Sequence, residues 1–433
     1  MKEDFLYYLW SQLAFDRADL RTTADEPLTI FATGIRNADA GPDFAAARLR
    51  IGDVEWSGSV EMHLRASDWA RHHHQHDAAY DQVILHVVWD ADADVRRQDG
   101  TLIPTLELRG RVAGGLIMRY NSLVQAEHPI ACAGLVQAVP DVIRTMMRER
   151  ALLERAEVKA DRVAALLAAT GTDWEATTWL TLLAGFGFKT NDDPMRRLGQ
   201  TLPWTVVRRY RSQPRELEAL LLGQAGLLPD AADPNEESYT VALRDSWRHL
   251  QRKHQLDPAA ALRPHDWKFG RMRPANFPPV RLAQVAAVLA RHEHLLANLR
   301  GAAGSPRQLT EFFAAPVSDY WQEHYHFGKE AKMAARLGAD SSHRLVMNVA
   351  VPVLVAYARY HHRPGDVEEA LAVLDRLPAE HNRVLAPYED LRFQNRTAAD
   401  SQGLLGLWTG YCAPRACLRC AIGANILKRA PGR

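Results

Sequence analysis

Residues 54–64 read VEWSGSVEMHL, and this stretch decides the fold of the first part of the chain. Apolar or small residues alternate with polar ones, which is the pattern of a β-strand whose two faces differ. The first set is Val54, Trp56, Gly58, Val60, Met62 and Leu64, and the second is Glu55, Ser57, Ser59, Glu61 and His63. Glu61 and His63 are therefore expected side by side on the polar face of this strand.

Predicted elements on either side of this strand complete an α/β domain. They are an amphipathic helix at 4–15, strands at 28–33 and 45–51, a helix at about 68–81, an apolar strand at 83–89 and an edge strand at 102–108 that contains a proline. The main order is helix, three strands, helix and strand.

From about residue 139 the apolar residues recur at helical spacing instead. The predicted helical segments are 140–169, 172–187, 237–254, 279–299, 306–337, 343–361 and 366–376. We therefore expect an α/β domain at 1–138, a large, mostly α-helical region at 139–400 and a cysteine-bearing tail at 401–433 that packs on the rest.

The order of the first elements resembles that of the PD-(D/E)XK nucleases. Their motif places Pro-Asp at the start of the second strand and (D/E)-x-K on the third. Here Pro42 and Asp43 precede the strand at 45–51, and Glu61-Met62-His63 lies on the next strand, 18 residues after Asp43. The resemblance implies a nuclease-like fold and a metal-dependent nuclease that acts on the phosphodiester bonds of nucleic acid.

Phosphodiester hydrolysis needs a divalent cation that stabilises developing negative charge and activates water. Asp43 and Glu61 are the predicted ligands of Mg²⁺ or Mn²⁺, since these ions prefer oxygen donors. The predicted catalytic residues are these two and His63, which stands where the motif has lysine. Histidine can act as a base but carries no fixed positive charge. A catalytically inactive nuclease fold that binds nucleic acid or serves as a scaffold is therefore the second interpretation, and exposed strand residues without a metal are the third.

Histidines gather in the stretch RHHHQHD at 71–77. On a helix, His72 and His76 would share a face, as zinc-binding histidines do, and Asp68 or His63 could supply a third ligand. This arrangement would suit a different, zinc-dependent hydrolase. A solvated polar helix face is the simpler interpretation.

Other polar and aromatic residues have simple structural interpretations beside functional ones. His86 lies within the apolar strand 83–89 and is expected to be a hydrogen-bonded core histidine. Aromatic and basic residues are interleaved at 247–253 and at 267–273, where they could stack on bases and contact phosphates. Ordinary helix and loop surfaces have the same mixture.

Three cysteines, Cys412, Cys417 and Cys420, have the spacing C-x4-C-x2-C. Thiolates this close favour zinc or an iron–sulfur cluster, and a four-coordinate site needs one more ligand, which could be Cys132. Some PD-(D/E)XK nucleases resemble this layout, with one distant cysteine and three near the C-terminal end around an iron–sulfur cluster. Buried thiols in a helical tail are the alternative.

Composition narrows the class of protein. The first residues show no signal-peptide pattern, no apolar run approaches 18 residues, and four cysteines in 433 residues suit a reducing cytoplasm. No G-x-x-x-x-G-K-[ST] motif for ATP is present. Residues 1–138 hold 13 Lys/Arg and 20 Asp/Glu, a net charge of −7, whereas 139–433 hold 40 and 32, a net charge of +8. An acidic first part suits a divalent cation, and a basic second part suits a polyanion such as nucleic acid.

Four stretches resemble one family of bacterial proteins, known by its domain of unknown function 2851. They are NADAGPDFAAARLRIGDVEWSGSVEMHLRASDWARHHHQHDAAYDQVILHVVW at 37–89, FGFKTN at 186–191, WQEHYHFGK at 321–329 and SQGLLGLWTGYCAPRACLRCAIGANIL at 401–427. The family resemblance implies no activity by itself, so the nuclease hypothesis rests on the motif order.

Overall fold

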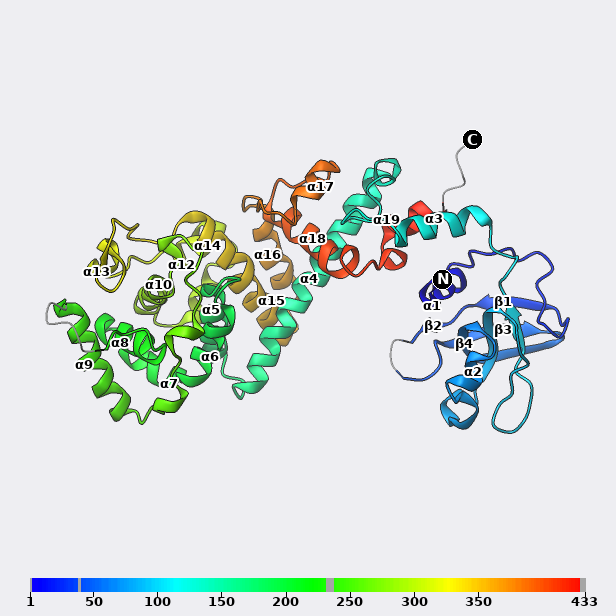
Figure 1. Cartoon of the computed structure of the whole chain (residues 1–433), viewed down its shortest axis with the longest axis horizontal. Coiled ribbons are helices and arrows are strands. Elements are labelled where there is room, and N and C mark those ends of the chain that lie inside the picture. The colour runs from blue at the N-terminus through cyan, green and yellow to red at the C-terminus, as the bar shows by residue number, and fades with distance from the viewer. Residues whose placement is uncertain (1, 38–39, 231–236, 429–433) are drawn as a thin grey trace. The chain divides into compact units, whose positions relative to one another are not determined.

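The computed structural model describes residues 2–37, 40–230 and 237–428, which divide into two compact units (Figure 1). Unit 1 comprises Met1–Met147 and Trp408–Arg433, and unit 2 comprises Arg148–Leu407. Unit 1 is therefore discontinuous in sequence, with unit 2 inserted between its two segments. The predicted succession of an N-terminal domain with a mixed sheet and a mostly helical region is confirmed.

A mixed sheet forms the centre of unit 1. Its strands are β1 (Leu28–Ala32), β2 (Ile35–Arg36), β3 (Phe44–Ile51), β4 (Val54–Arg65), β5 (Val83–Asp90) and β6 (Thr105–Glu107). The order across the sheet is β1-β3-β4-β5-β6, and β2 also pairs with β3. The pairs β1–β3 and β3–β4 are antiparallel, whereas β4–β5 and β5–β6 are parallel. β4 is thus the middle strand, and β6 confirms the predicted edge position.

The strand β4 changes character along its length. Its first residues pair only with β3, because the pairing with β5 begins at Ser59. Val54 and Trp56 are 54% and 43% exposed, so the apolar face of this first part of the strand is not buried. Residues 60–63 are all buried, because here strands lie on both sides of β4 and both faces of the sheet are covered. The polar side chains of this part are therefore held away from bulk water.

The helices of unit 1 are shorter than the sequence pattern predicted. α1 spans Glu3–Ser11 and packs its apolar side chains towards β4. The helix expected at 68–81 is wrong beyond its first turn, because α2 ends at Arg71 and His73 adopts a left-handed conformation with φ 60°. The one-turn 3-10 helices η1 (His74–His76) and η2 (Ala78–Tyr80) follow. This reversal turns the histidine-rich stretch back towards the sheet.

The rest of unit 1 comes from two distant parts of the sequence. α3 (Gly114–Val124), the short 3-10 helix η3 (Val136–Ala138) and the start of α4 follow the sheet. The π-helical turn η9 (Trp408–Cys412), the 3-10 turn η10 (Cys417–Arg419) and α19 (Ala421–Lys428) come from the second segment. α19 packs against α3 and η10 within this unit (Figure 1).

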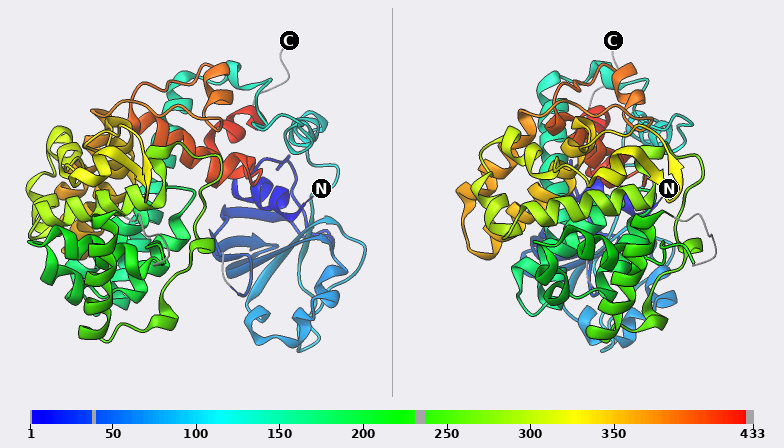
Figure 2. Two further views of the ribbon diagram at one scale, coloured as in Figure 1. Left: turned by 60° about the vertical axis from the view of Figure 1, so that its left-hand side comes forward. Right: turned by 90° about the vertical axis from the view of Figure 1, so that its left-hand side faces the viewer.

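Unit 2 is a helical unit around one apolar core (Figure 2). Its helices are α4 (Asp141–Ala169, which begins in unit 1), α5 (Trp174–Phe186), α6 (Asp192–Thr201), α7 (Trp204–Val207), α8 (Pro214–Gln224), α9 (Ser238–Lys253), α10 (Pro278–Arg291), α11 (Leu295–Gly301), α12 (Pro306–Phe313), α13 (Asp319–Glu323), α14 (Ala339–Leu345), α15 (Val351–Tyr360), α16 (Pro364–Asp375), α17 (Ala386–Asp390) and α18 (Ala398–Leu407). Within the ranges that the structure describes, no helix is long and apolar enough to cross a membrane.

Two of the predicted helical segments are divided. The segment 279–299 holds α10 and α11, and 306–337 holds α12, α13 and a hairpin of β7 (His324–His326) and β8 (Lys329–Glu330). A single long helix at either place is wrong. Helical periodicity continues across these breaks because each short helix turns an apolar face to the same core.

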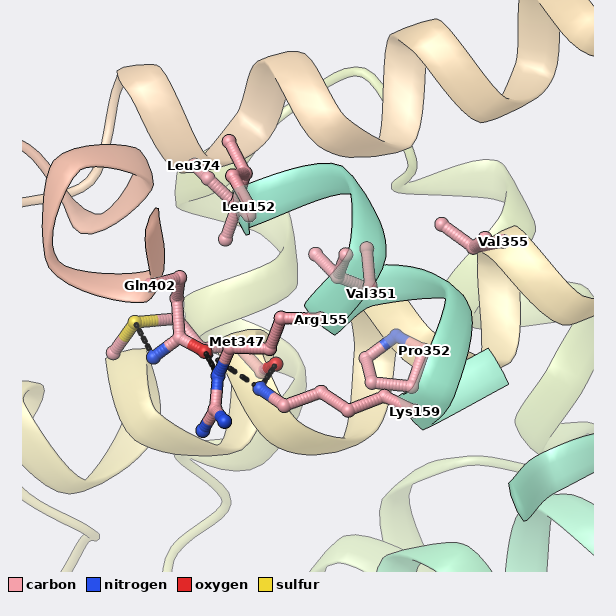
Figure 3. Close-up of a pocket in the computed structure, with 10 residues that line it drawn as sticks. Leu152, Arg155, Lys159, Met347, Val351, Pro352, Val355, Leu374 and Gln402 are labelled. Atoms are coloured by element: carbon pink, nitrogen blue, oxygen red, sulfur yellow. Dashed lines mark hydrogen bonds between the residues drawn. The ribbon is translucent and has the colours of Figure 1, made fainter. Parts of the chain in front are cut away.

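A half-buried lysine marks the packing of α4 within unit 2. Lys159 lines a small apolar pocket, and its Nζ donates to Gln402 Oε1 at 2.7 Å and Met347 O at 3.1 Å (Figure 3). It also donates to Asn348 Oδ1 at 2.9 Å. Burial and the neighbouring Arg155 lower the pKa of Lys159 to about 7. The chain itself therefore supplies one acceptor for each ammonium proton.

Candidate metal centre

Asp43 and Glu61 each hydrogen-bond the backbone of the other's segment. Asp43 N donates to Glu61 Oε2 at 3.0 Å, and Met62 N donates to Asp43 Oδ2 at 3.0 Å. The register explains this arrangement, since Phe44 pairs with Val60 and the preceding residue comes opposite Glu61. The structure thus brings the two predicted carboxylates together where β3 begins, and Glu61 Oε1 remains directed elsewhere.

Burial changes the acidity of these carboxyl groups. Glu61 is 5% exposed, and the pKa of its carboxyl group is raised to about 8, first by burial and then by the nearby charge of Asp43. Burial likewise raises the pKa of Asp43 to about 6, although the Tyr7 hydroxyl and Met62 N oppose this shift by hydrogen bonding. The interpretation of Glu61 and His63 as exposed strand residues is wrong, since His63 is only 2% exposed.

Three imidazoles converge beside Glu61. One ring nitrogen each of His63, His72 and His74 lies within 4.8 Å of the other two. His63 Nε2 is 3.2 Å from His72 Nδ1, and Glu61 Oε1 is 3.6 Å from His63 Nε2 and 3.5 Å from His74 Nε2. Zinc bonds to nitrogen of about 2.1 Å in a tetrahedron separate the ligand atoms by roughly 3.4 Å. The ring nitrogens of the three histidines therefore have the spacing of a metal site, and we call these three residues together with Glu61 the histidine centre.

The predicted pairing of His72 with His76 on a helix is wrong. The two residues do not share a helical face, because α2 ends at Arg71 and the chain reverses at His73. The reversal directs His74 to the centre, and His76 is not part of the group. The interpretation of the stretch as solvated holds for His72, His73 and His76, which are exposed, but not for His74, whose side chain is only 12% exposed.

His86 supports His63 from the next strand. His63 Nδ1 and His86 Nε2 share a hydrogen bond of 2.8 Å, and His86 is fully buried, which confirms its predicted role as a hydrogen-bonded core histidine. Burial first, and neighbouring histidines second, lower the pKa of His63 to about 2 and that of His86 to about 3. Both imidazoles are therefore neutral at physiological pH, the form that binds metals. Such an outer hydrogen bond orients a metal-binding imidazole and determines its tautomer.

Aromatic side chains that the sequence analysis did not single out hold the centre in shape. The ring of His74 stacks on Tyr80 with centroids 3.8 Å apart, and Trp69 meets the edges of His74 and His86 at 5.3 Å and 5.5 Å. From α1, the Tyr7 hydroxyl hydrogen-bonds Asp43. No periodicity marks these residues as site residues, because they meet only through tertiary packing.

The cysteines do not belong to the histidine centre. Cys132 follows α3, and Cys412, Cys417 and Cys420 lie in the second segment of unit 1. Three of the four side chains are half-buried, and Cys420 is 8% exposed. The structure thus places all four in the same compact unit as the histidine centre but outside its group of ligand atoms.

Comparison with known proteins agrees with the family resemblance of the sequence. No curated protein and no solved structure matches the chain. The model of one family, described as a protein of unknown function (DUF2851), matches residues 3–383. The match includes every residue of the histidine centre and ends before the three clustered cysteines. The chain belongs to the DUF2851 family.

Proposed function

We propose that unit 1 is a divalent-metal-dependent nuclease that hydrolyses phosphodiester bonds of nucleic acid. The observation that carries the proposal is that ring nitrogens of His63, His72 and His74 lie close enough to share one ion, with Glu61 and Asp43 beside them. Metal-assisted hydrolysis needs such a set of donors, because the cation must be held while a coordination position stays open for substrate or water.

The arrangement of strands supports the nuclease part of the proposal. Asp43 precedes β3, and Glu61 and His63 lie in the buried half of the central strand β4. This is the placement of the carboxylates in the PD-(D/E)XK motif. We therefore propose that unit 1 has a fold of this superfamily, with His63 at the position of the motif's lysine.

The donor set favours a different metal from the one that two carboxylates alone predicted. Glu61 Oε2 accepts the Asp43 backbone N–H, so Glu61 Oε1 is the oxygen that faces His63 and His74. Imidazole nitrogen suits zinc, iron or nickel, whereas magnesium and manganese prefer oxygen. We propose that the histidine centre holds a zinc-type ion, and Mg²⁺ or Mn²⁺ between Asp43 and Glu61 is the alternative that the experiment below separates.

The residues of the centre have distinct proposed roles. When bound, the ion would polarise a phosphoryl oxygen and lower the pKa of a bound water to about 7. Asp43, whose pKa of about 6 is close to neutrality, is suited to accept the proton of the attacking water. His63 is neutral and cannot replace the positive charge of lysine, so it serves as a ligand.

The neutrality of His63 favours a second candidate function, which is a catalytically inactive nuclease fold that binds nucleic acid or serves as a scaffold. Without a fixed positive charge beside the carboxylates, the chain itself supplies less stabilisation of a negatively charged transition state. The aromatic part of the nucleic-acid hypothesis also needs correction. Trp267 is 4% exposed and donates from Nε1 to Ala225 O, so base stacking by this residue is wrong.

The test uses the full chain, stripped of metal and then supplied with Zn²⁺, Mn²⁺ or Mg²⁺ in turn. Single- and double-stranded DNA and RNA are offered, and products are separated by size. We expect cleavage with zinc, and its loss in Glu61→Gln. The matched control is Glu55→Gln, which changes an exposed carboxylate of the same strand and should leave cleavage intact.

Other outcomes of this test have defined meanings. Cleavage that survives Glu61→Gln contradicts the proposed site. Cleavage with magnesium but not zinc, lost in both Asp43→Asn and Glu61→Gln, favours the two-carboxylate site. Binding that weakens steeply with salt, without any cleavage, favours the inactive binding protein.

A further inference from the structure

The four cysteines of the chain are brought towards one another within unit 1. They are Cys132 from the first segment and Cys412, Cys417 and Cys420 from the second, and together we call them the cysteine site. Nearly three hundred residues separate Cys132 from the others, yet both parts belong to one compact unit. The tail therefore returns to the region that follows α3.

Two hydrogen bonds hold the tail against α3 and the residues that follow it. Arg415, between Cys412 and Cys417, donates from Nη2 to Ala126 O at 2.9 Å, six residues before Cys132. Arg119 on α3 donates from Nη2 to Leu427 O of α19 at 3.0 Å. These hydrogen bonds connect two points of the cysteine-bearing tail, Arg415 and Leu427, to the segment that carries Cys132.

The turn between the last two cysteines is closely packed. Cys417 O accepts from Cys420 N at 3.3 Å and lies against α19 at Gly423. A Cβ atom on Gly423 would come within 2.1 Å of Cys417 O, so only glycine permits this approach. The short turn orders two thiols with few backbone residues to fix, which lowers the entropic cost of bringing ligands together.

The Cys132 thiol lies near the other three thiols of the site. Burial first, and then the charges of Cys412, Cys420 and Cys417, raise the pKa of the Cys132 thiol, so all three partners lie within electrostatic range of it. Burial and Cys420 raise the pKa of Cys417 to about 11.

Arg415 supplies an independent observation. Its Nη1 is buried and has no hydrogen-bond partner among the residues that the structure describes. The guanidinium also lies close enough to Cys417 to oppose the rise in that thiol's pKa. A buried cationic donor without an acceptor is costly. A metal held by four thiolates carries net negative charge, so it would provide the partner that Arg415 Nη1 lacks.

We propose that the cysteine site binds one thiophilic metal centre, either a zinc ion or an iron–sulfur cluster, which ties the two sequence segments of unit 1 together. Soft thiolate ligands select these metals over magnesium or calcium. The centre closes a loop that contains the whole of unit 2, and its binding free energy adds to the folding free energy of unit 1. This inference does not depend on the proposed nuclease activity.

The test measures metal in untagged full chain purified without oxygen or chelator. About one zinc per chain indicates a single ion, whereas iron with acid-labile sulfide and visible absorption indicates a cluster. To separate the two sites of unit 1, the measurement is repeated in His74→Ala, which disables the histidine centre and should retain the cysteine-bound metal. Cys417→Ser and Cys132→Ser should lose it, and Ala413→Ser, an exposed change in the same loop, is the matched control.

A second measurement uses a chain that keeps all four cysteines, because a cysteine variant could lose metal simply by failing to fold. Metal-stripped His74→Ala chain is titrated with Co²⁺, and thiolate coordination gives intense charge-transfer absorption that nitrogen and oxygen ligands do not. We expect these bands to saturate at one cobalt per chain. Absence of metal in the anaerobic protein together with absence of these bands would overturn the inference. A metal content in Cys132→Ser equal to that of Ala413→Ser would remove the tie between the two segments and so overturn it as stated.

Discussion

Two polar clusters, one in each unit, differ in how their donors and acceptors find hydrogen-bond partners. In unit 2, each proton of the Lys159 ammonium has an acceptor from the chain, at 2.7–3.1 Å. In unit 1, the donor atoms of His63 and His74 face Glu61 at 3.6 Å and 3.5 Å, beyond the distance of good hydrogen bonds. The first cluster is satisfied by its own residues, whereas in the second His63 Nε2 has only the 3.2 Å contact with His72 Nδ1 besides these longer approaches to Glu61.

This difference teaches how to separate structural from functional polar groups. Burying polar atoms without partners costs free energy, so a fold retains such a cluster only where something else offsets the cost. His86 Nδ1 adds to that cost, since it is buried without a partner among the described residues. A bound cation would accept electron pairs from the ligand atoms of the histidine centre, whereas the Lys159 ammonium already has three acceptors. The predictions below test this contrast.

The largest expected effect is on metal affinity at the histidine centre. His74→Ala removes one imidazole ligand and should weaken zinc binding by more than about 100-fold, beyond the range usual for outer-shell changes. Competition with a chromophoric chelator measures this, in a chain whose cysteine site is already saturated. His76→Ala changes a histidine of the same turn outside the group and should bind zinc as the unaltered protein does. Equal losses in the two variants would contradict the ligand assignment.

A smaller loss of affinity is expected from the residue behind His63. His86→Leu removes the hydrogen-bond partner of His63 Nδ1 and should weaken zinc binding by about 10–100-fold without abolishing it. Thermal unfolding of the metal-free variant provides the control. The substitution leaves His63 Nδ1 without a partner, so the metal-free variant should also lose about 1–3 kcal/mol of stability. That loss together with normal zinc affinity would show that His86 only fills the core.

The satisfied cluster of unit 2 should respond in stability and not in metal binding. Lys159→Met removes the donor to Met347 O and Asn348 Oδ1, while Gln402 Oε1 still accepts from Arg155 Nε at 2.9 Å, and the free energy of unfolding should fall by about 1 kcal/mol. Chemical denaturation followed by a probe in unit 2 measures this. Lys332→Met, on the surface of the same unit, should have little effect. A change in zinc affinity in Lys159→Met would break the separation between the two clusters.

The last prediction is a pH dependence from Lys159, which is small for each pH unit. Burial lowers its pKa to about 7 in the folded protein, below the value of 10.5 for an unperturbed lysine. The unfolded chain therefore binds this proton more strongly, so the stability of unit 2 should rise between pH 7 and 10.5, by at most about 1.4 kcal/mol per pH unit. Unfolding across this range in the unaltered chain and in Lys159→Met isolates the contribution. Parallel curves for the two proteins would show that the lysine stays charged.

Several strands could be predicted from the sequence because their patterns report burial directly. The alternation at 54–64 and the apolar run at 83–89 correspond to β4 and β5, and the proline near 104 correctly indicated an edge. The same period of two placed Glu61 and His63 on one face. Prediction failed at 68–81, where a left-handed residue interrupts a helical pattern. A single backbone conformation of this kind depends on what the chain meets next and leaves no periodic signal.

The sequence alone determined the class of the two main parts, the strand that carries Glu61 and His63, and the close spacing of Cys412, Cys417 and Cys420. Each of these follows from short-range periodicity or spacing, which neighbouring residues express without help from the rest of the chain. Only the tertiary structure decided that His74 joins His63, and that Cys132 lies in the same unit as the tail. The reversal after α2 and the return of the chain after unit 2 bring these residues together. The physical reason is that packing between distant segments selects this arrangement, whereas local backbone preferences do not.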